Sequence, residues 1–132
     1  MQDRPSAAEL LRIARETLVG ELLPLLPEER KLDVLIIANV MAIAAREAAF
    51  GDAPLRAELA RLAALYDDKP APDEPLAATV ERLSRRLAAD IRRGAFETDP
   101  TKLAEARAHL LETTLQKLRA NNPRYLEAEG FE

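Results

Sequence analysis

The chain has one histidine, His109, with Glu105 four residues before it and Glu112 three residues after it. On a helix these side chains share a face, so they could act as metal ligands or as a general base with an orienting carboxylate. Ion-paired side chains on an exposed helix face explain the same spacing, and we favour that interpretation because such pairs are routine. A di-iron centre needs two Glu-x-x-His units, whereas the residue three before His109 is Ala106. We therefore expect no functional metal and no cofactor.

Motifs for nucleophilic or cofactor chemistry are also missing. The 132 residues include no cysteine, which excludes disulfides, thiolate nucleophiles and cysteine-ligated metals. The sequence has no nucleophile elbow, P-loop, dinucleotide fingerprint or zinc-protease motif. We expect an accessory protein rather than an enzyme.

A basic stripe marks the predicted helix of residues 76–93. At 100° per residue its arginines share one sector, and its apolar residues occupy the opposite sector. The stripe could hold a phosphate-bearing ligand or the acidic face of a partner. The favoured alternative is a solvated face that pairs with Glu81 and with the acidic loop of residues 67–75. The arginines are Arg82, Arg85, Arg86, Arg92 and Arg93.

Charge and hydropathy limit the partners further. The chain has 19 basic and 23 acidic residues, a net charge of −4, and only 4% aromatic residues. Nucleic-acid binding normally needs a basic surface and stacking aromatics, so we expect no nucleic-acid partner. The longest nearly uncharged run, residues 34–45, is shorter than the roughly 20 residues that span a bilayer. No secretory signal is visible at the N-terminus, so we expect no membrane partner and a cytoplasmic location.

The most informative polar residues lie between Glu28 and Phe50. This segment is apolar on all sides between residues 33 and 46, which predicts a buried, central helix. One stripe of it, which we call the seam, repeats at four, three, four, three and four residues, as in a coiled coil. The seam consists of Leu32, Ile36, Asn39, Ile43, Arg46 and Phe50.

The amide of Asn39 and the guanidinium of Arg46 need hydrogen-bond partners if the seam is buried. Partners within the fold, a subunit interface and a pocket all remain open. Glu9 and Glu47 are candidate shared acceptors, because Glu9 starts the first helix and Glu47 is next to Arg46. A buried role predicts that Asn39→Ala costs roughly 1 to 3 kcal/mol of stability.

The elements that position these residues form an expected all-α bundle of about five helices, a single domain over residues 1–132. Alanine, leucine, glutamate and arginine dominate, which favours helix, and no strand pattern occurs. Ser6 with Glu9 predicts a capping box, and Asp99-Pro100 predicts a helix start. The loop of residues 67–75 has three prolines and four acidic residues and should be the most mobile internal segment. The expected helices are 7–22, 28–50, 54–66, 76–93 and 100–120, followed by a tail at 124–132.

Several short motifs along the chain carry a resemblance to a known family. They are Asp3-Arg4-Pro5 with Glu9-Leu10-Leu11, Ala38-Asn39 with Ala42-Ile43 and Arg46-Glu47, and Lys117-Leu118 with Asn121-Asn122-Pro123-Arg124-Tyr125-Leu126. With them the chain resembles short uncharacterised bacterial proteins, often encoded beside aminoglycoside-phosphotransferase-like kinases and acyl-CoA dehydrogenases. The resemblance implies no catalytic residue. It implies a neighbourhood in which larger enzymes handle acyl-CoA or phosphorylated acyl intermediates.

Two functional hypotheses follow. The leading one is a non-catalytic accessory protein, a homodimeric bundle that supports a kinase-like or acyl-CoA dehydrogenase partner. The alternative is a binding module or minor enzyme for acyl-CoA or a phosphate-bearing ligand, with a pocket near Asn39 and Arg46 that a terminal arginine closes. A deep cleft at those two residues would favour the second hypothesis, and a flat apolar face the first. The candidate ligand or interface residues are Arg4, Asn39, Arg46, Glu47, Arg82, Arg86, Arg93, His109, Arg124 and Tyr125.

Overall fold

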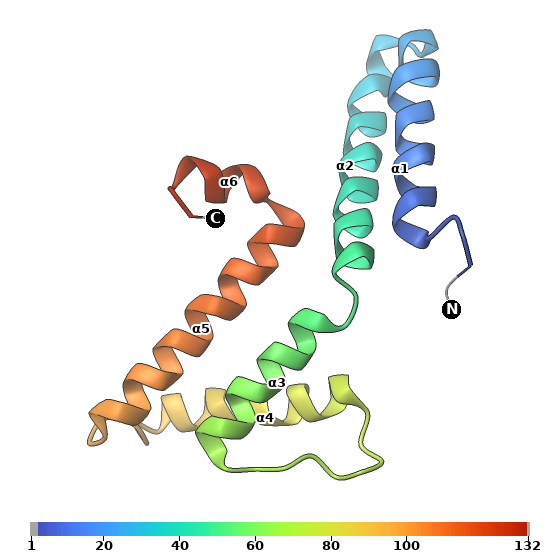
Figure 1. Ribbon diagram of the computed structural model, residues 1–132. Helices are drawn as coiled ribbons and strands as arrows, with labels where there is room; N and C mark the ends of the chain where they lie inside the picture. Colours follow the sequence, from blue (N-terminus) through green and yellow to red (C-terminus); the bar gives the residue numbers. More distant parts are fainter. Residues whose placement is uncertain (1–2, 132) are drawn as a thin grey trace. The chain divides into compact units, whose positions relative to one another are not determined.

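The computed structural model describes residues 3–131, which form six α-helices and no strand (Figure 1). The all-α fold is confirmed. By their contacts the described residues divide into two compact units. Unit 1 contains residues 3–51 and 120–131, and unit 2 contains residues 52–119. The single domain expected over residues 1–132 stays a prediction.

Unit 1 begins with two helices that lie side by side, α1 (Ala7–Thr17) and α2 (Glu28–Phe50) (Figure 1). The expected capping box starts α1. The backbone N–H of Glu9 donates to Ser6 Oγ at 3.2 Å, and that of Ser6 donates to the Glu9 carboxylate at 2.7 Å. These hydrogen bonds lower the pKa of Glu9 because they favour its charged form. Arg15 Nε joins the two helices by donating to the carbonyl of Ala38 at 3.0 Å.

The connection between α1 and α2 changes helix type twice. A π-helical turn (Leu18–Leu22) continues from α1, and a 3₁₀ turn (Leu23–Leu25) follows it. The regular α-helix therefore ends at Thr17 and not at Leu22 as expected. Pro24 cannot donate to an α-helical ladder, which accounts for the tighter last turn.

The expectation that α2 is a buried, central helix is wrong. Only Val34 and Ala38 are buried along its 23 residues. Its bounds match the expected ones, but within unit 1 it packs lengthwise mainly against α1. One neighbouring helix covers one side, so the apolar residues on the other sides stay exposed.

A short helix, α6 (Pro123–Ala128), occupies most of the expected C-terminal tail. Its start repeats the chemistry that opens α5 (Pro100–Asn121), where the Asp99 side chain accepts from the backbone N–H of Lys102 at 3.1 Å. In α6 the Asn122 side chain accepts from the backbone N–H of Tyr125 at 3.3 Å, and Pro123 takes the first helical position. The tail prediction failed because Asn122-Pro123 both ends one helix and begins the next.

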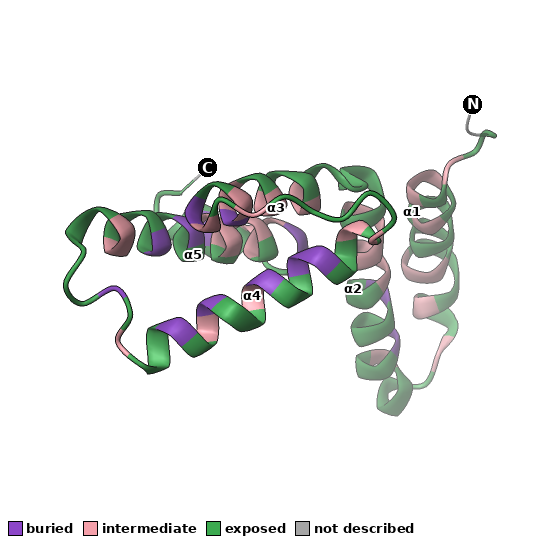
Figure 2. Ribbon diagram, turned by 90° about the horizontal axis from the view of Figure 1, so that it is seen from below, coloured by how far each residue is buried: buried purple, intermediate pink, exposed green. Residues whose placement is uncertain are grey.

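Unit 2 contains α3 (Ala53–Tyr66), α4 (Leu76–Arg92) and most of α5. The apolar residues of α4 lie on one face, and that face is buried (Figure 2). It packs against α3 and the first half of α5 in a continuous core. The core consists of Leu62, Leu65, Val80, Leu83, Leu87, Phe96 and Ala106.

The proline-rich loop of residues 67–75 joins α3 to α4. Asp67 ends α3 with a left-handed backbone conformation, φ 48°. Arg82 donates to Asp68 at 3.3 Å and to Glu74 at 3.1 Å, so one arginine of α4 holds both ends of the loop. The mobility expected for this loop therefore applies to the residues between Asp68 and Glu74.

Candidate functional site

Unit 1 exposes a large set of apolar side chains, which we call the α1/α2 apolar surface. Leu25 is 80% exposed and Leu32 is 67% exposed, the highest values in the set. So many exposed large apolar side chains on one small unit are unusual, because scattered single ones are the norm and larger exposed sets typically mark interaction sites. The set comprises Leu10, Ile13, Leu22, Leu25, Leu32, Leu35, Ile36, Ile37 and Val40.

The seam predicted from the sequence lies on α2 largely outside the core. Leu32, Ile36 and Asn39 are exposed at its N-terminal part, whereas Ile43 and Arg46 are half-buried. Asn39 is thus not buried within the chain, which excludes a core position for it and leaves the subunit interface open. The buried residues of α2, Val34 and Ala38, lie on the other side of the helix, where Arg15 of α1 donates to the Ala38 carbonyl.

Arg46 has a partner within the fold that differs from both expected acceptors. Its Nε donates to the carbonyl of Ala120 at 2.6 Å, which ties α2 to the last turn of α5. A helix C-terminus carries unpaired carbonyls and partial negative charge, so a guanidinium stabilises it. Glu47, the acceptor expected beside Arg46, is exposed.

A surface pocket of about 370 Å³ lies between α1 and α2. Arg12, Arg15 and Arg46 bring three guanidinium groups to its wall, and Glu9 brings one carboxylate. Its apolar lining is made of Met41 and of alanines from both helices. Such a wall suits an anion that carries an apolar body.

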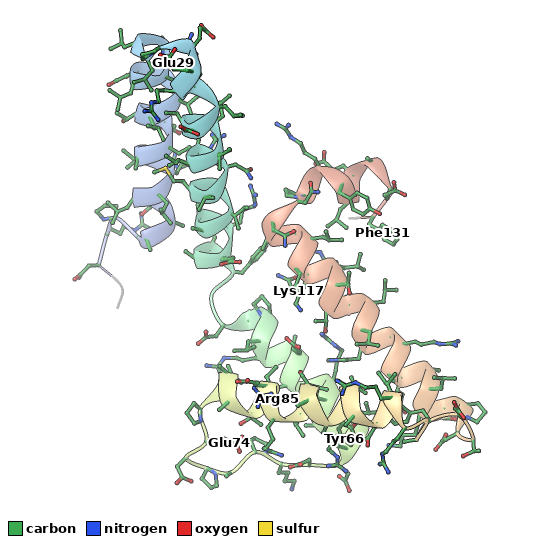
Figure 3. All side chains as sticks on the ribbon, turned by 180° about the vertical axis from the view of Figure 1, so that it is seen from behind. Glu29, Tyr66, Glu74, Arg85, Lys117 and Phe131 are labelled. Carbon is green, nitrogen blue, oxygen red and sulfur yellow. The ribbon has the colours of Figure 1, made fainter. Side chains whose placement is uncertain are left out.

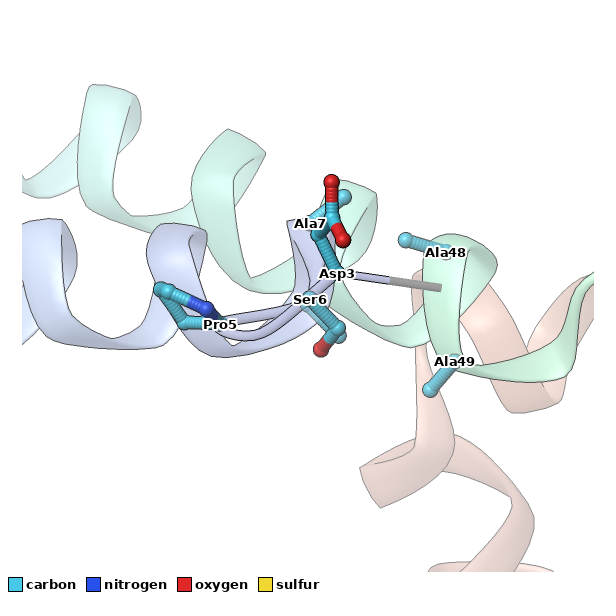
Figure 4. Close-up of a pocket in the computed structure, with 7 residues that line it drawn as sticks. Asp3, Pro5, Ser6, Ala7, Ala48 and Ala49 are labelled. Carbon is cyan, nitrogen blue, oxygen red and sulfur yellow. The ribbon is translucent and has the colours of Figure 1, made fainter. Parts of the chain in front are cut away.

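A second pocket, of about 450 Å³, lies at the start of α1 (Figure 4). Asp3, Pro5 and Ser6 line it from one side, and Ala48 and Ala49 line it from α2. Among the described residues of its lining the charged side chain is the acidic Asp3, so it is a poorer anion site than the pocket beside Arg46. The described linings of the two pockets include none of Arg4, Asn39, Glu47 and Arg124. Arg4, Arg124 and Tyr125 are exposed.

Arg82, Arg85 and Arg86 of α4 are engaged in ion pairs. Arg82 pairs with Asp68 and Glu74 of the loop, as described above. The guanidinium of Arg86 lies 4.1 Å from the centre of the Tyr66 ring. Arg85 pairs with Glu81, and Arg86 lies 3.8 Å from the Asp68 carboxylate. Figure 3 shows Arg85, Tyr66 and Glu74 in this part of unit 2. The geometry agrees with the favoured interpretation of a solvated face that pairs with Glu81 and the acidic loop.

His109 is buried, with 4% of its surface exposed, so its placement on an exposed helix face was wrong. Its Nδ1 accepts from Arg61 Nε at 3.2 Å, and Arg61 also donates to Thr113 Oγ1 at 3.2 Å. Burial, and then the Arg61 charge, lower the pKa of His109, because both disfavour the imidazolium. Neither predicted carboxylate serves it: Glu105 is exposed and Glu112 pairs with Arg119 at 3.0 Å.

His109 therefore joins α3 to α5 as a neutral hydrogen-bond acceptor. Among residues 3–131 no group of three or more histidine, cysteine, aspartate and glutamate side chains is placed to hold a metal ion.

A buried carboxylate that the sequence did not reveal lies at Asp90. Tyr66 Oη donates to Asp90 Oδ2 at 2.7 Å, and Arg93 pairs with Oδ1 at 2.7 Å. Burial and the Asp90 bond raise the pKa of Tyr66, and the Tyr66 and Arg93 bonds lower the pKa of Asp90. Arg93, a predicted site residue, is thereby part of a structural cluster. The only local signal was the Asp90 to Arg93 spacing, because Tyr66 lies on another helix.

A comparison with models of protein families identifies the family of this chain. The family model described as domain of unknown function DUF6285 matches residues 24–125. The chain belongs to this family. No curated protein and no solved structure matches the chain.

The DUF6285 match covers α2 to α5 and does not include α1. It contains the whole seam and the whole basic stripe, while it assigns no activity to any residue. In the part of the chain that the structure describes, no single helix is long and apolar enough to cross a membrane; α2 and α3 pass that test only when counted together.

Proposed function

We propose that this DUF6285 protein is a non-catalytic accessory protein that binds a larger enzyme. The enzyme is a kinase-like protein or an acyl-CoA dehydrogenase encoded beside it in bacteria, and the complex acts in the cytoplasm. The observation that carries the proposal is the α1/α2 apolar surface. The absence of cysteine fits a reducing compartment.

The energetics of that surface favour a protein partner. Burying a leucine or isoleucine side chain contributes about 1.5 to 3 kcal/mol, and nine large apolar side chains of unit 1 are at least half exposed or nearly so. The described polar clusters, at His109 and at Asp90, hold helices together. An interaction surface therefore explains more of the structure than an active site does.

Co-expression with each enzyme encoded next to the gene tests the proposal. We expect the native chain to co-elute with one of them in size-exclusion chromatography. The double variant Ile13→Arg with Ile37→Arg should not co-elute, because it places two charges on the α1/α2 apolar surface. Leu110→Arg with Leu111→Arg is the matched control, since these leucines are about equally exposed but belong to unit 2. Separate elution of the native chain from both enzymes would refute the proposal.

The pocket beside Arg46 favours a second candidate function, the binding of an acyl-CoA or another phosphate-bearing ligand. Three guanidinium groups can hold a phosphate, and the alanine and methionine lining can hold an apolar chain. Calorimetric titration with coenzyme A and, separately, with inorganic phosphate tests it. Binding of coenzyme A that weakens about tenfold in Arg12→Gln, a loss of about 1.4 kcal/mol, is the expected result. No heat of binding at millimolar coenzyme A would exclude this function.

A further inference from the structure

The seam of α2 has the geometry of one half of a coiled coil. In heptad terms Ile36, Ile43 and Phe50 take the a positions, and Leu32, Asn39 and Arg46 take the d positions. Its N-terminal part is exposed: Leu32 is 67% exposed and Ile36 is 54% exposed. The two buried residues of α2, Val34 and Ala38, lie on the side away from the seam. Packing of α1 therefore leaves the N-terminal part of the seam open to another helix, while Ile43 and Arg46 stay half-exposed.

Charges along the seam select the occupant and its direction. Glu29 lies seven residues before Ile36 and so takes an a position at the first turn of α2, where Figure 3 labels it. Arg46 takes a d position near the other end. A parallel pair of identical helices would place Glu29 against Glu29 and Arg46 against Arg46. An antiparallel pair places opposite charges together, so the seam is complementary to itself when reversed.

One antiparallel register pairs a with d positions and satisfies these charges. Glu29 then faces Arg46 of the second copy, Leu32 faces its Ile43, and Ile36 faces its Asn39, each twice by symmetry. Beside the seam, Leu35 faces Ala42 and Asp33 faces Val40, so this register opposes no like charges. A shift by one heptad would place Asp33 opposite Glu47 and Ile36 opposite Arg46.

We infer that the seam pairs with the seam of a second copy of this chain, antiparallel and in that register. Arg46 is suited to its part, because the contact to Ala120 uses only its Nε–H, and a guanidinium carries five N–H donors. Asn39 is the polar residue that fixes the register, a role that asparagine has in coiled-coil seams. The inference rests on the proposed function. It assigns one part of the α1/α2 apolar surface, the exposed part of the seam, to a second copy of the chain.

Disulfide trapping tests the direction and the register. Because the chain has no cysteine, each substitution introduces a unique thiol. Leu32→Cys and Ile43→Cys proteins, mixed and oxidised mildly, should form a crosslinked heterodimer, whereas each alone should crosslink little. Leu25→Cys mixed with Ile43→Cys is the control, since Leu25 is exposed but lies outside the seam. Crosslinking of each variant alone shows parallel pairing and overturns the inference, as does the absence of any crosslink.

A charge exchange gives an independent test. Glu29→Arg should raise the dimer dissociation constant about tenfold in light scattering, because it opposes two arginines. Glu29→Arg with Arg46→Glu should restore it, and helical circular dichroism checks that both proteins fold. No change in Glu29→Arg would refute the register. A monomeric chain that still binds a neighbouring enzyme refutes this inference alone, and a dimeric chain that binds neither enzyme refutes only the proposed function.

Discussion

The two units of this chain treat apolar side chains in opposite ways. In unit 2 most large apolar residues of α4 lie on one face, where Val80, Leu83 and Leu87 are buried in the core with α3 and α5. In unit 1 the apolar residues of α2 surround the helix, and two of them are buried. One neighbouring helix covers a single face. The comparison shows that the spread of apolar residues around a helix decides how many neighbouring helices are needed to cover them. In unit 1, α2 has fewer neighbouring helices than its apolar residues need.

The largest expected effect comes from the core of unit 2. Leu83 has no exposed surface, so Leu83→Ala should lower the free energy of unfolding by about 2 to 5 kcal/mol through lost burial and a cavity. Leu25→Ala removes the same atoms from an exposed site of unit 1 and should cost less than about 0.5 kcal/mol. Urea denaturation measures both. Equal losses would show that Leu25 is as well packed as Leu83.

A smaller loss is expected at the buried carboxylate of unit 2. Tyr66→Phe removes the hydroxyl that donates to Asp90 Oδ2 and should cost about 1 to 2 kcal/mol, because the pairing of Arg93 with Oδ1 does not replace that hydrogen bond. Tyr125→Phe is the matched control on the exposed side of unit 1 and should change the thermal midpoint little. If the two variants melted alike, the Tyr66 hydrogen bond would contribute nothing to the core.

The stability of unit 2 should also depend on pH through His109. The fold lowers the pKa of this histidine, so the unfolded chain takes up a proton that the folded chain resists. The contribution is full above the ordinary histidine pKa of about 6.5 and is lost as pH falls below it. Thermal midpoints between pH 7.5 and 5.5 should fall less in His109→Gln than in the native chain. A steeper fall in the variant would contradict the neutral, buried imidazole.

The smallest effect is expected at Asn39. Because its side chain is exposed, Asn39→Ala should change the unfolding free energy of the dilute, monomeric chain by less than about 0.5 kcal/mol. This replaces the loss predicted from the sequence alone. A loss of 1 kcal/mol or more at high dilution would show that the amide has a partner within one chain.

The helices could be predicted from local chemistry. The bounds of α2 follow from Pro27, the acidic first turn and Gly51, and the Ser6 and Asp99 caps form as expected. The Asn122 cap was missed, although it has the same chemistry, because its proline was taken only as a helix end. Local signals of this kind act within one turn, so sequence shows them directly.

Burial could not be predicted in the same way, because it depends on which helices meet. His109 was expected on an exposed face and lies against Arg61, 48 residues away in the chain. For Asn39 a partner within the fold, a pocket and an interface were all open, and its side chain is exposed, since α1 lies against the other side of α2. The seam itself was visible as a period of four and three residues. What the sequence could not show is that no helix of unit 1 covers its N-terminal part.

Sedimentation equilibrium tests the central claim, that the seam of α2 is an interface between two copies of this chain. We compare the native chain with Ile36→Glu in the seam and with Leu111→Glu, an equally exposed residue of unit 2. At tens of micromolar the native chain and Leu111→Glu should have twice the mass of one chain. Ile36→Glu should have the mass of one chain and an unchanged helical circular dichroism spectrum. A native chain with the mass of one chain at every concentration would contradict the account.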